Sequence, residues 1–334
     1  RKFGSENWVA VDDSFLIASC SKAFTATLAA VLVEDGVLTW NTTLGEAYPD
    51  LDMRKEYENI TLMQLLSHRA GLPEWIDHLT SKTKNDKFDK KWWVDRKQQK
   101  IMRFNYLKET VAQELADTPD ASVYYSNSGY LMAGAMIEKI AGKSYEQLMI
   151  EEIFNPLELH TAGVGLPLRL GSSFQPYGHK AAGSTLTPIN RDFPVWMAPT
   201  AVIHVSIEDW AKFVQFHLKP EISGKARLND DILKALHTPP NQADWREDAE
   251  ENDYGVPSLN YALGWYTIDI IGKKGLLWHP GGNTGFIAQV ILDPGRNNAI
   301  LLVTNVRTKH EHLFKAMRRI KAHYADIADL PSIR

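Results

Sequence analysis

A serine and a lysine three residues apart, Ser19 and Lys22, stand at the start of a nearly all-apolar stretch that ends at Gly36. Residues three apart share one face of a helix, so the hydroxyl and the ammonium are expected to point the same way. An ammonium in an apolar helix loses its hydration, which lowers its pKa unless it finds a partner. A serine at a helix N-terminus also faces the positive end of the helix dipole, which favours a developing alkoxide. The pair could therefore act as a nucleophile and its base.

A phenol and an amide in the middle of the chain could complete such a site. Tyr125 and Asn127 stand just before a second apolar helix, which we expect over 130–140. A phenol beside a lysine can exchange a proton with a serine hydroxyl and with a leaving group, and an amide can hold a substrate carbonyl. A capped helix start with core tyrosines explains the same segment equally well, so the segment is informative only together with the others.

The third group is His279-Pro280-Gly281-Gly282, at the end of an expected strand. Glycines at such a place let a substrate lie along the strand edge and leave backbone N–H groups available to bind an oxyanion. The segment could thus supply the binding edge and the oxyanion-stabilising groups of an acyl-transfer site.

Other chemistries lack their sequence patterns. The chain has no Gly-x-Ser-x-Gly elbow, no His-Glu-x-x-His, no Gly-x-Gly-x-x-Gly and no phosphate-loop pattern. Metal, dinucleotide and nucleotide cofactors are therefore not expected. The Ser-x-x-Lys spacing does recur at Ser81 and Lys84, but in a polar, basic segment without helix context. Spacing alone consequently does not single out Ser19.

The composition bounds the class of protein. The 334 residues carry a net charge of −4, with 44% hydrophobic and 10% aromatic residues, which favours a globular enzyme over a nucleic-acid-binding protein. The single cysteine, Cys20, excludes an internal disulfide and a Cys-rich zinc site, and we expect it to pack in the core. No apolar run approaches the ~20 residues of a membrane-spanning helix.

The helices that must position these groups are marked by caps and breakers. A buried helix is expected over 19–35, followed by a helix-rich middle of the chain. Serine or threonine N-caps precede three of the expected helices, at Thr61, Ser144 and Ser206. The stretch 166–199 is rich in Gly, Pro, Ser and Thr, which predicts long ordered loops.

The last third of the chain differs from the rest in its pattern of hydrophobic and turn-forming residues. After about residue 259, short β-rich runs alternate with Gly, Pro and Asn turns, which predicts an antiparallel meander. A final helix is expected over 309–324. The fold class is therefore α+β. The expected strands cover 261–271, 276–279, 286–292 and 299–305.

Taken together, the three groups resemble the class C β-lactamase and DD-peptidase family of penicillin-recognising serine hydrolases, which also contains esterases and D-amino-acid peptidases and amidases. The order of the motifs is the same, and the similar segments 65–73, 125–134 and 206–213 extend the resemblance over nearly the whole chain. The resemblance implies an antiparallel sheet flanked by helices, plus a mostly helical domain, with the active site between them. The expected boundaries are 1–60 with 206–334 for the sheet domain, and 61–205 for the helical one.

The resemblance also assigns catalytic roles by position. Ser19 would be the acyl-forming nucleophile, and Lys22 and Tyr125 would handle its proton. Asn127 would orient the substrate. The implied mechanism is acyl transfer in two steps through a covalent ester, with water completing the turnover and no cofactor or metal involved.

The third motif resembles that of the family in its glycines but differs from it at its first residue. His279 and Gly281 would contact the substrate, and the backbone N–H groups of Ser19 and Gly282 would form the oxyanion hole. The β-lactamases usually have a lysine where this chain has His279. A neutral imidazole offers a weaker fixed charge for a substrate carboxylate than an ammonium does, which favours a peptidase, amidase or esterase over a lactam hydrolase.

The second departure is at the front of the chain. Family members normally have a helix and a strand hairpin before the segment that resembles Phe3-Gly4, and this sequence lacks those strands. It also lacks a signal segment. From the resemblance we expect a periplasmic or secreted protein, with a cytosolic location as the alternative.

The sequence therefore predicts a serine hydrolase that acts on a small ester, amide or D-amino-acid peptide, without nucleic-acid partners and with an undetermined oligomeric state. A true β-lactamase or D-Ala-D-Ala carboxypeptidase is the alternative enzyme, and a penicillin-binding sensor without turnover is the alternative of another class. His68, His179 and His204 are expected to serve packing rather than catalysis, and no glutamate stands out as a group for deacylation.

Overall fold

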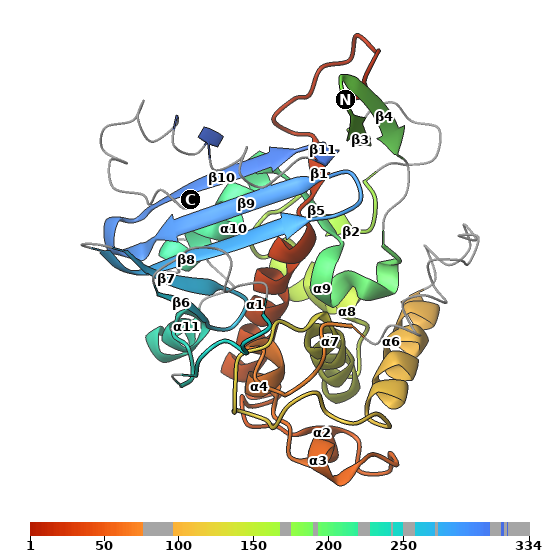
Figure 1. Cartoon of the computed structure of the whole chain (residues 1–334), viewed down its shortest axis with the longest axis vertical. Helices are drawn as coiled ribbons and strands as arrows, with labels where there is room; N and C mark the ends of the chain where they lie inside the picture. The colour runs from red at the N-terminus through yellow and green to blue at the C-terminus, as the bar shows by residue number, and fades with distance from the viewer. Residues whose placement is uncertain are drawn as a thin grey trace.

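A five-stranded antiparallel sheet occupies one side of the computed structural model (Figure 1). Its strands run in the spatial order β10-β9-β8-β7-β6, so that each strand pairs with its neighbour in sequence. This confirms the predicted meander, in which turns such as Pro294–Arg296 return the chain beside itself. The strands are β6 (Leu259–Tyr261), β7 (Tyr266–Ile270), β8 (Lys273–Gly282), β9 (Ile287–Asp293) and β10 (Asn298–Thr304).

The structure describes residues 1–75, 96–167, 175–189, 193–219, 228–241, 243–249, 258–270 and 273–307, together with 315, 316 and 319. The predicted helix over 309–324 lies almost entirely outside the described residues. The competing Ser-x-x-Lys pattern at Ser81 and Lys84 also lies outside them.

Most of the helices lie beyond the β6 end of the sheet, whereas α10 lies behind β9 and β10 (Figure 1). The α-helices of the first half are α1 (Ser21–Glu34), α2 (Leu44–Ala47), α3 (Lys55–Glu58), α4 (Leu62–Leu66), α6 (Arg96–Thr110), α7 (Asn127–Ala141) and α8 (Tyr145–Leu148). Those of the second half are α9 (Ala198–Ala201), α10 (Ile207–Leu218) and α11 (Asp230–His237). Short 3-10 turns are η1 (Ala18–Cys20), η4 (Val195–Met197) and η7 (Pro294–Arg296), and η3 (Met149–Phe154) is a π-helix.

Helix α1 runs between the sheet and the other helices (Figure 1). Every residue from Ser21 to Leu32 is buried, as the apolar pattern predicts. Gly36 has a φ of +68°, the left-handed conformation in which glycine commonly ends a helix. The predicted start differs slightly, because residues 18–20 form the turn η1 and regular α-helix begins at Ser21.

The predicted N-caps are confirmed. The Thr61 hydroxyl accepts a hydrogen bond from the Gln64 N–H at 3.2 Å, and the Oε1 of Gln64 accepts one from the Thr61 N–H at 2.9 Å, forming the expected capping box. Ser144 and Ser206 accept in the same way from residues three positions later. Local side-chain chemistry therefore fixes where these helices begin.

The prediction of loops over 166–199 is wrong for part of that stretch. Residues Gly178–Ala182 and Thr185–Ile189 form the antiparallel hairpin β3–β4 around Gly183, whose φ is +60°. The hairpin adds β11 (Val306–Arg307) as a parallel neighbour of β3. Because β11 comes more than a hundred residues later in the chain, this pairing could not be predicted from local composition.

A second small sheet leads the chain into the site. It has the order β1-β5-β2, with β1 (Ser14–Leu16), β5 (Ile203–Ser206) and β2 (Gly163–Val164). The antiparallel pairing of β1 with β5 continues to Ile17, whose N–H donates to the carbonyl of Ile203 at 3.1 Å. The next residue begins the η1 turn.

Candidate active site

Ser19 lies on a tight turn between β1 and α1. Ala18, directly before it, has a φ of +49°, a left-handed conformation that a residue with a Cβ adopts rarely. The turn lifts the chain out of the strand, and Ser19 stays partly exposed while Ala18 and Cys20 on either side are buried. The predicted position of Ser19, where an extended segment turns into a helix, is confirmed.

Strand β8 runs directly against this turn. A Cβ added at Gly281 would lie 2.3 Å from the carbonyl oxygen of Ile17 and 3.1 Å from the backbone nitrogen of Ser19. Only glycine lets the strand approach so closely. Gly282 is the next residue and the last of β8, paired with Ile287 of β9. The third motif and Ser19 are thus neighbours in space.

Lys22 is fully buried one helical turn after Ser19. Its Nζ donates to the Oδ1 of Asn127 at 2.7 Å and to the carbonyl oxygen of Thr200 at 3.0 Å. Both acceptors are neutral dipoles. Burial lowers the pKa of Lys22 to about 7, and the negative charge of Glu74 opposes that shift only in part.

Tyr125 places its ring beside this lysine. The Nζ of Lys22 lies 4.8 Å from the centre of the Tyr125 ring and 5.5 Å from that of Tyr130. The Tyr125 ring also stacks on Tyr266 of β7, with centroids 6.3 Å apart and an angle of 5° between the planes. The first and second motifs therefore meet, although they are about a hundred residues apart in the chain.

Asn127 is the first residue of α7, and Ser126 caps that helix. The amide oxygen of Asn127 accepts from Lys22 and also from the hydroxyl of Thr200 at 2.5 Å. Its amide nitrogen donates to Glu74 at 3.0 Å. These contacts fix the orientation of the amide group.

His279 is buried within β8 and is hydrogen-bonded on both sides of its ring. Its Nε2 lies 2.9 Å from the hydroxyl of Tyr261, and its Nδ1 lies 2.7 Å from the carbonyl oxygen of Pro280. Burial, and next the charge of Lys22, lower the pKa of His279 to about 3. The imidazole is therefore neutral at physiological pH and supplies no positive charge.

Cys20 packs as predicted. It is buried, and its thiol donates to the backbone carbonyl of His279 at 3.3 Å. Burial raises the pKa of the thiol, so it remains protonated and unreactive in the fold. This hydrogen bond joins the start of α1 to β8.

Two residues at the site were not predicted, Glu74 and Thr200. Glu74 follows the Gly71-Leu72-Pro73 turn, and its backbone carbonyl accepts from the Ser128 N–H at 3.1 Å. Thr200 comes directly after the stretch 166–199 that was predicted to form loops, and it lies in the short helix α9. Neither residue stands in a pattern that predicts chemistry, because both reach Asn127 only through the tertiary fold.

The histidines expected to serve packing do make structural contacts. His179 accepts from the N–H of Phe3 at 2.9 Å, and its other ring nitrogen lies 2.9 Å from the carbonyl oxygen of Asn305. His204 contacts the carbonyl of Gly165 at 2.7 Å, and burial lowers its pKa to about 4. His68 has a more specific environment, which is described below.

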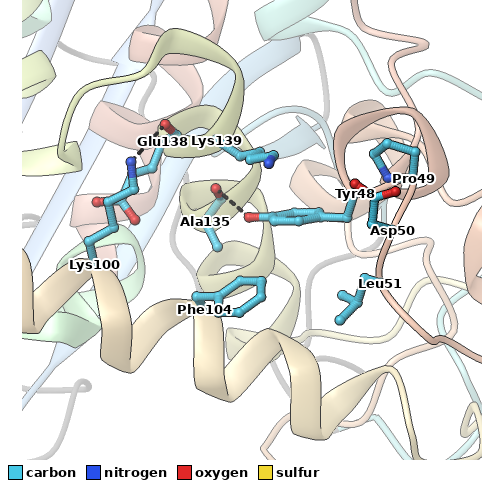
Figure 2. Close-up of a pocket in the computed structure, with 9 residues that line it drawn as sticks. All are labelled: Tyr48, Pro49, Asp50, Leu51, Lys100, Phe104, Ala135, Glu138 and Lys139. Carbon is cyan, nitrogen blue, oxygen red and sulfur yellow. Dashed lines mark hydrogen bonds between the residues drawn. The ribbon is translucent and has the colours of Figure 1, made fainter.

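A cavity of about 330 Å³ lies elsewhere, between α6, α7 and the segment after α2 (Figure 2). Its two lysines are already engaged: Lys100 donates to the carbonyl of Glu138 at 3.3 Å, and Lys139 lies over the ring of Tyr48. The Tyr48 hydroxyl donates to the carbonyl of Ala135 at 2.7 Å. This cavity brings together no nucleophile and base comparable to Ser19 and Lys22.

Within the described ranges, no three His, Cys, Asp or Glu side chains gather as metal ligands would. Across the same ranges, each helix is too short or too polar to traverse a bilayer.

Fold and site together define a β-lactamase/transpeptidase-like protein. The octameric penicillin-binding protein homologue from Pyrococcus abyssi superposes with a TM-score of 0.74 at 19% identity, over 95% of this chain and 67% of that one. The D-amino acid amidase from Ochrobactrum anthropi SV3 superposes with a TM-score of 0.67 at 24% identity, over 90% of this chain and 79% of that one.

The chain belongs to the beta-lactamase family, whose model matches residues 4–325. Protein flp of Staphylococcus aureus (strain MW2) is 26% identical over 307 residues, which is 89% of this chain and 55% of that protein. The chain thus spans about half the length of this relative.

Proposed function

We propose that the protein hydrolyses a small amide or ester through an acyl-enzyme on Ser19. The observation that carries the proposal is the environment of Lys22, which is buried against Tyr125 and, among the described residues, donates hydrogen bonds only to neutral acceptors. With a pKa near 7 it spends much of its time as a neutral amine. A neutral amine has two N–H donors, which Asn127 and Thr200 engage, and a lone pair that can take a proton.

In the first step, Ser19 Oγ attacks the substrate carbonyl carbon and its proton passes to Lys22 or Tyr125. The negative oxygen that forms is held by the backbone N–H groups of Ser19 and Gly282. The bond to the leaving amine or alcohol then breaks, and the leaving group receives the proton. Water attacks the ester in the second step, which releases the acid and restores the Ser19 hydroxyl.

The electrostatics of the site favour substrates without a carboxylate at the third motif. His279 is neutral and both of its ring nitrogens are engaged, so it offers no cation where the β-lactamases usually have a lysine. The exposed carboxylate of Glu74, bonded to Asn127, adds negative charge at the same site. Uncharged substrates, or those with an amino group, fit this field better than β-lactam carboxylates.

The amidase likeness supports the same choice. The Ochrobactrum protein with this fold is a D-amino acid amidase in complex with L-phenylalanine amide. An amino-acid amide has an amino group and no carboxylate, which matches the charge pattern described above. We therefore propose amino-acid amides, small esters and D-peptides with a blocked C-terminus as the substrate class.

The test is a burst experiment with intact-protein mass spectrometry. Wild-type protein mixed with a p-nitrophenyl ester should release a rapid burst of p-nitrophenol and gain one acyl group on Ser19. Ser19→Ala should keep the fold and lose both signals, while Ser21→Ala serves as the neighbouring control for the site of labelling. Absence of an adduct across esters, amino-acid amides and a chromogenic cephalosporin would overturn the proposal. Preferential turnover of the cephalosporin would support the β-lactamase alternative instead.

A further inference from the structure

His68 holds the backbone on both sides of Tyr125. Its carbonyl oxygen accepts from the N–H of Tyr124 at 2.9 Å, and its Nδ1 accepts from the N–H of Ser126 at 3.0 Å. One residue thus accepts from the N–H groups of the residues directly before and directly after the tyrosine. No other described residue makes both of these contacts.

The ring of His68 also packs on the tyrosine itself. The two ring centres are 4.4 Å apart, and the ring of Tyr261 lies 4.3 Å from His68 on the β-sheet side. His68 is buried and packs against both tyrosine rings, which also contact each other edge to face with centres 6.2 Å apart. Tyr125 is therefore restrained through its ring as well as through its backbone.

The backbone of His68 adopts a left-handed conformation, with a φ of +60°. Such a conformation is uncommon for a residue with a side chain, although histidine and asparagine adopt it more readily than most. It follows α4 and Ser67, and it turns both the carbonyl and the imidazole of His68 toward the segment 124–126.

The acceptor role of Nδ1 requires an imidazole without a proton on that atom. Burial, followed by the charges of Lys22, His279 and Arg69, holds the pKa of His68 well below its usual value. The ring is therefore neutral at physiological pH, with its proton on Nε2. Nδ1 is then available to accept the hydrogen bond from the Ser126 N–H.

We propose that His68 is a positioning residue that sets the place of the Tyr125 phenol beside Lys22. The inference rests on the proposed function, in which Tyr125 moves a proton between Ser19, Lys22 and the leaving group. Proton transfer requires hydrogen-bond distance, and a displacement of about 1 Å can cost about a hundredfold in rate. The same hydrogen bond anchors Ser126, the cap of α7, and with it the first residue of that helix, Asn127.

The variants His68→Leu and His68→Asn separate this role from simple packing. Leucine has no acceptor, whereas the amide oxygen of asparagine can stand where Nδ1 does and asparagine tolerates a positive φ. With a p-nitrophenyl ester, we expect His68→Leu to lower kcat about a hundredfold with little change in KM. His68→Asn should retain kcat within about tenfold. Should His68→Leu fail to fold, His68→Gly, which fits the positive φ without strain, replaces it.

A double-mutant cycle with Tyr125→Phe tests the coupling. If His68 acts through Tyr125, removing the acceptor should lower kcat strongly in wild type and only slightly in the Tyr125→Phe background. Equal losses in both backgrounds, or equal activity of the leucine and asparagine variants, would overturn the inference. The Ser19 adduct of the wild-type protein is read in parallel: without it the proposed function fails, and with it only the role of His68 is at stake.

Discussion

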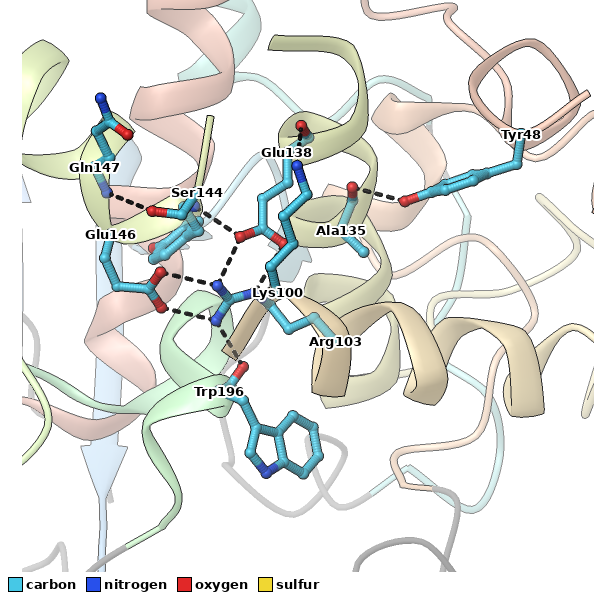
Figure 3. Close-up of polar contacts among 10 residues, drawn as sticks. Tyr48, Lys100, Arg103, Ala135, Glu138, Ser144, Glu146, Gln147 and Trp196 are labelled. Carbon is cyan, nitrogen blue, oxygen red and sulfur yellow. Dashed lines mark hydrogen bonds and ion pairs between the residues drawn. The ribbon is translucent and has the colours of Figure 1, made fainter. Parts of the chain in front are cut away.

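Two buried cations in this protein have opposite surroundings. Arg103 of α6 is fully buried and donates to both carboxylate oxygens of Glu138, at 2.7 and 3.0 Å, and to Glu146 at 2.9 Å (Figure 3). Its remaining nitrogen reaches the carbonyl of Trp196 at 3.1 Å. Lys22 is equally buried, but in the part of the chain that the structure describes its ammonium donates hydrogen bonds only to an amide oxygen and a carbonyl, beside two tyrosine rings.

The difference decides what each cation can do. Burial works to lower the pKa of Arg103, but the charges of Glu146 and Glu138 outweigh it and raise the pKa, so the guanidinium stays charged. It joins α6, α7, α8 and η4 as a permanent structural link. For Lys22, burial prevails, and the ammonium can lose its proton near neutral pH. A paired charge stabilises structure, whereas a charge solvated by dipoles alone is suited to proton transfer.

The strongest contrast should come from replacing Lys22 with methionine. We expect Lys22→Met to lower kcat/KM for a p-nitrophenyl ester by about 10²–10⁴-fold, the usual contribution of a general base. Stability should change by only about 1 kcal/mol, because an apolar residue of similar volume replaces a desolvated charge and Thr200 still donates to Asn127. Steady-state kinetics and urea denaturation measure the two effects. A large loss of stability with retained activity would reverse the comparison.

The matching change at the other cation is Arg103→Met, and its effect should be on stability. Removing the guanidinium leaves two carboxylates buried without their partner, which typically costs about 3–5 kcal/mol. Urea denaturation should show this loss, and Arg103→Lys, which keeps the charge without the forked geometry, should lose less. If Arg103→Met unfolds within 1 kcal/mol of wild type, the network is not a structural link.

The titration of Lys22 gives a third contrast. Since the neutral amine is the active form, kcat/KM should rise with pH through about 7 and level off above it. Stability should follow the same direction: between about 7 and the ordinary value of 10.5, the unfolded chain binds a proton that the folded chain does not, so stability rises with pH. The rise is at most about 1.4 kcal/mol per pH unit for one site.

Lys22→Met is the control for this pH dependence. The additional rise in stability between pH 7 and 10 should be missing from the variant, while the rest of the stability profile is retained. Denaturation of both proteins across this range measures the difference. Parallel profiles would show that Lys22 keeps its proton in the fold, as Arg103 does.

The smallest expected effect concerns the remote carboxylate of Glu74. Its charge raises the pKa of Lys22, in contrast to the direct ion pairs of Arg103. Glu74→Gln keeps an acceptor for Asn127 but removes the charge, so the acid limb of the pH–rate profile should move to lower pH. Because Glu74 is exposed and screened by solvent, we expect a shift of only about a few tenths of a unit. A shift to higher pH would contradict the assigned direction.

The parts of the fold that the sequence predicted depend on short-range physics. The buried helix after Ser19, the caps at Thr61 and Ser144, and the C-terminal meander follow from periodicity, capping side chains and turn residues. The hairpin β3–β4 was missed because its composition is typical of loops, and its pairing with β11 comes from the far end of the chain.

The features of the candidate site also fall into those that the sequence predicts and those that only the tertiary structure sets. The sequence by itself predicted that Ser19 and Lys22 point the same way, because residues three apart on a helix share one face. Only the tertiary structure decided that Lys22 meets dipoles instead of a carboxylate, that His279 is neutral, and that Glu74 and Thr200 reach Asn127. These properties depend on groups far apart in the chain and on burial, and burial sets the dielectric that fixes their charge.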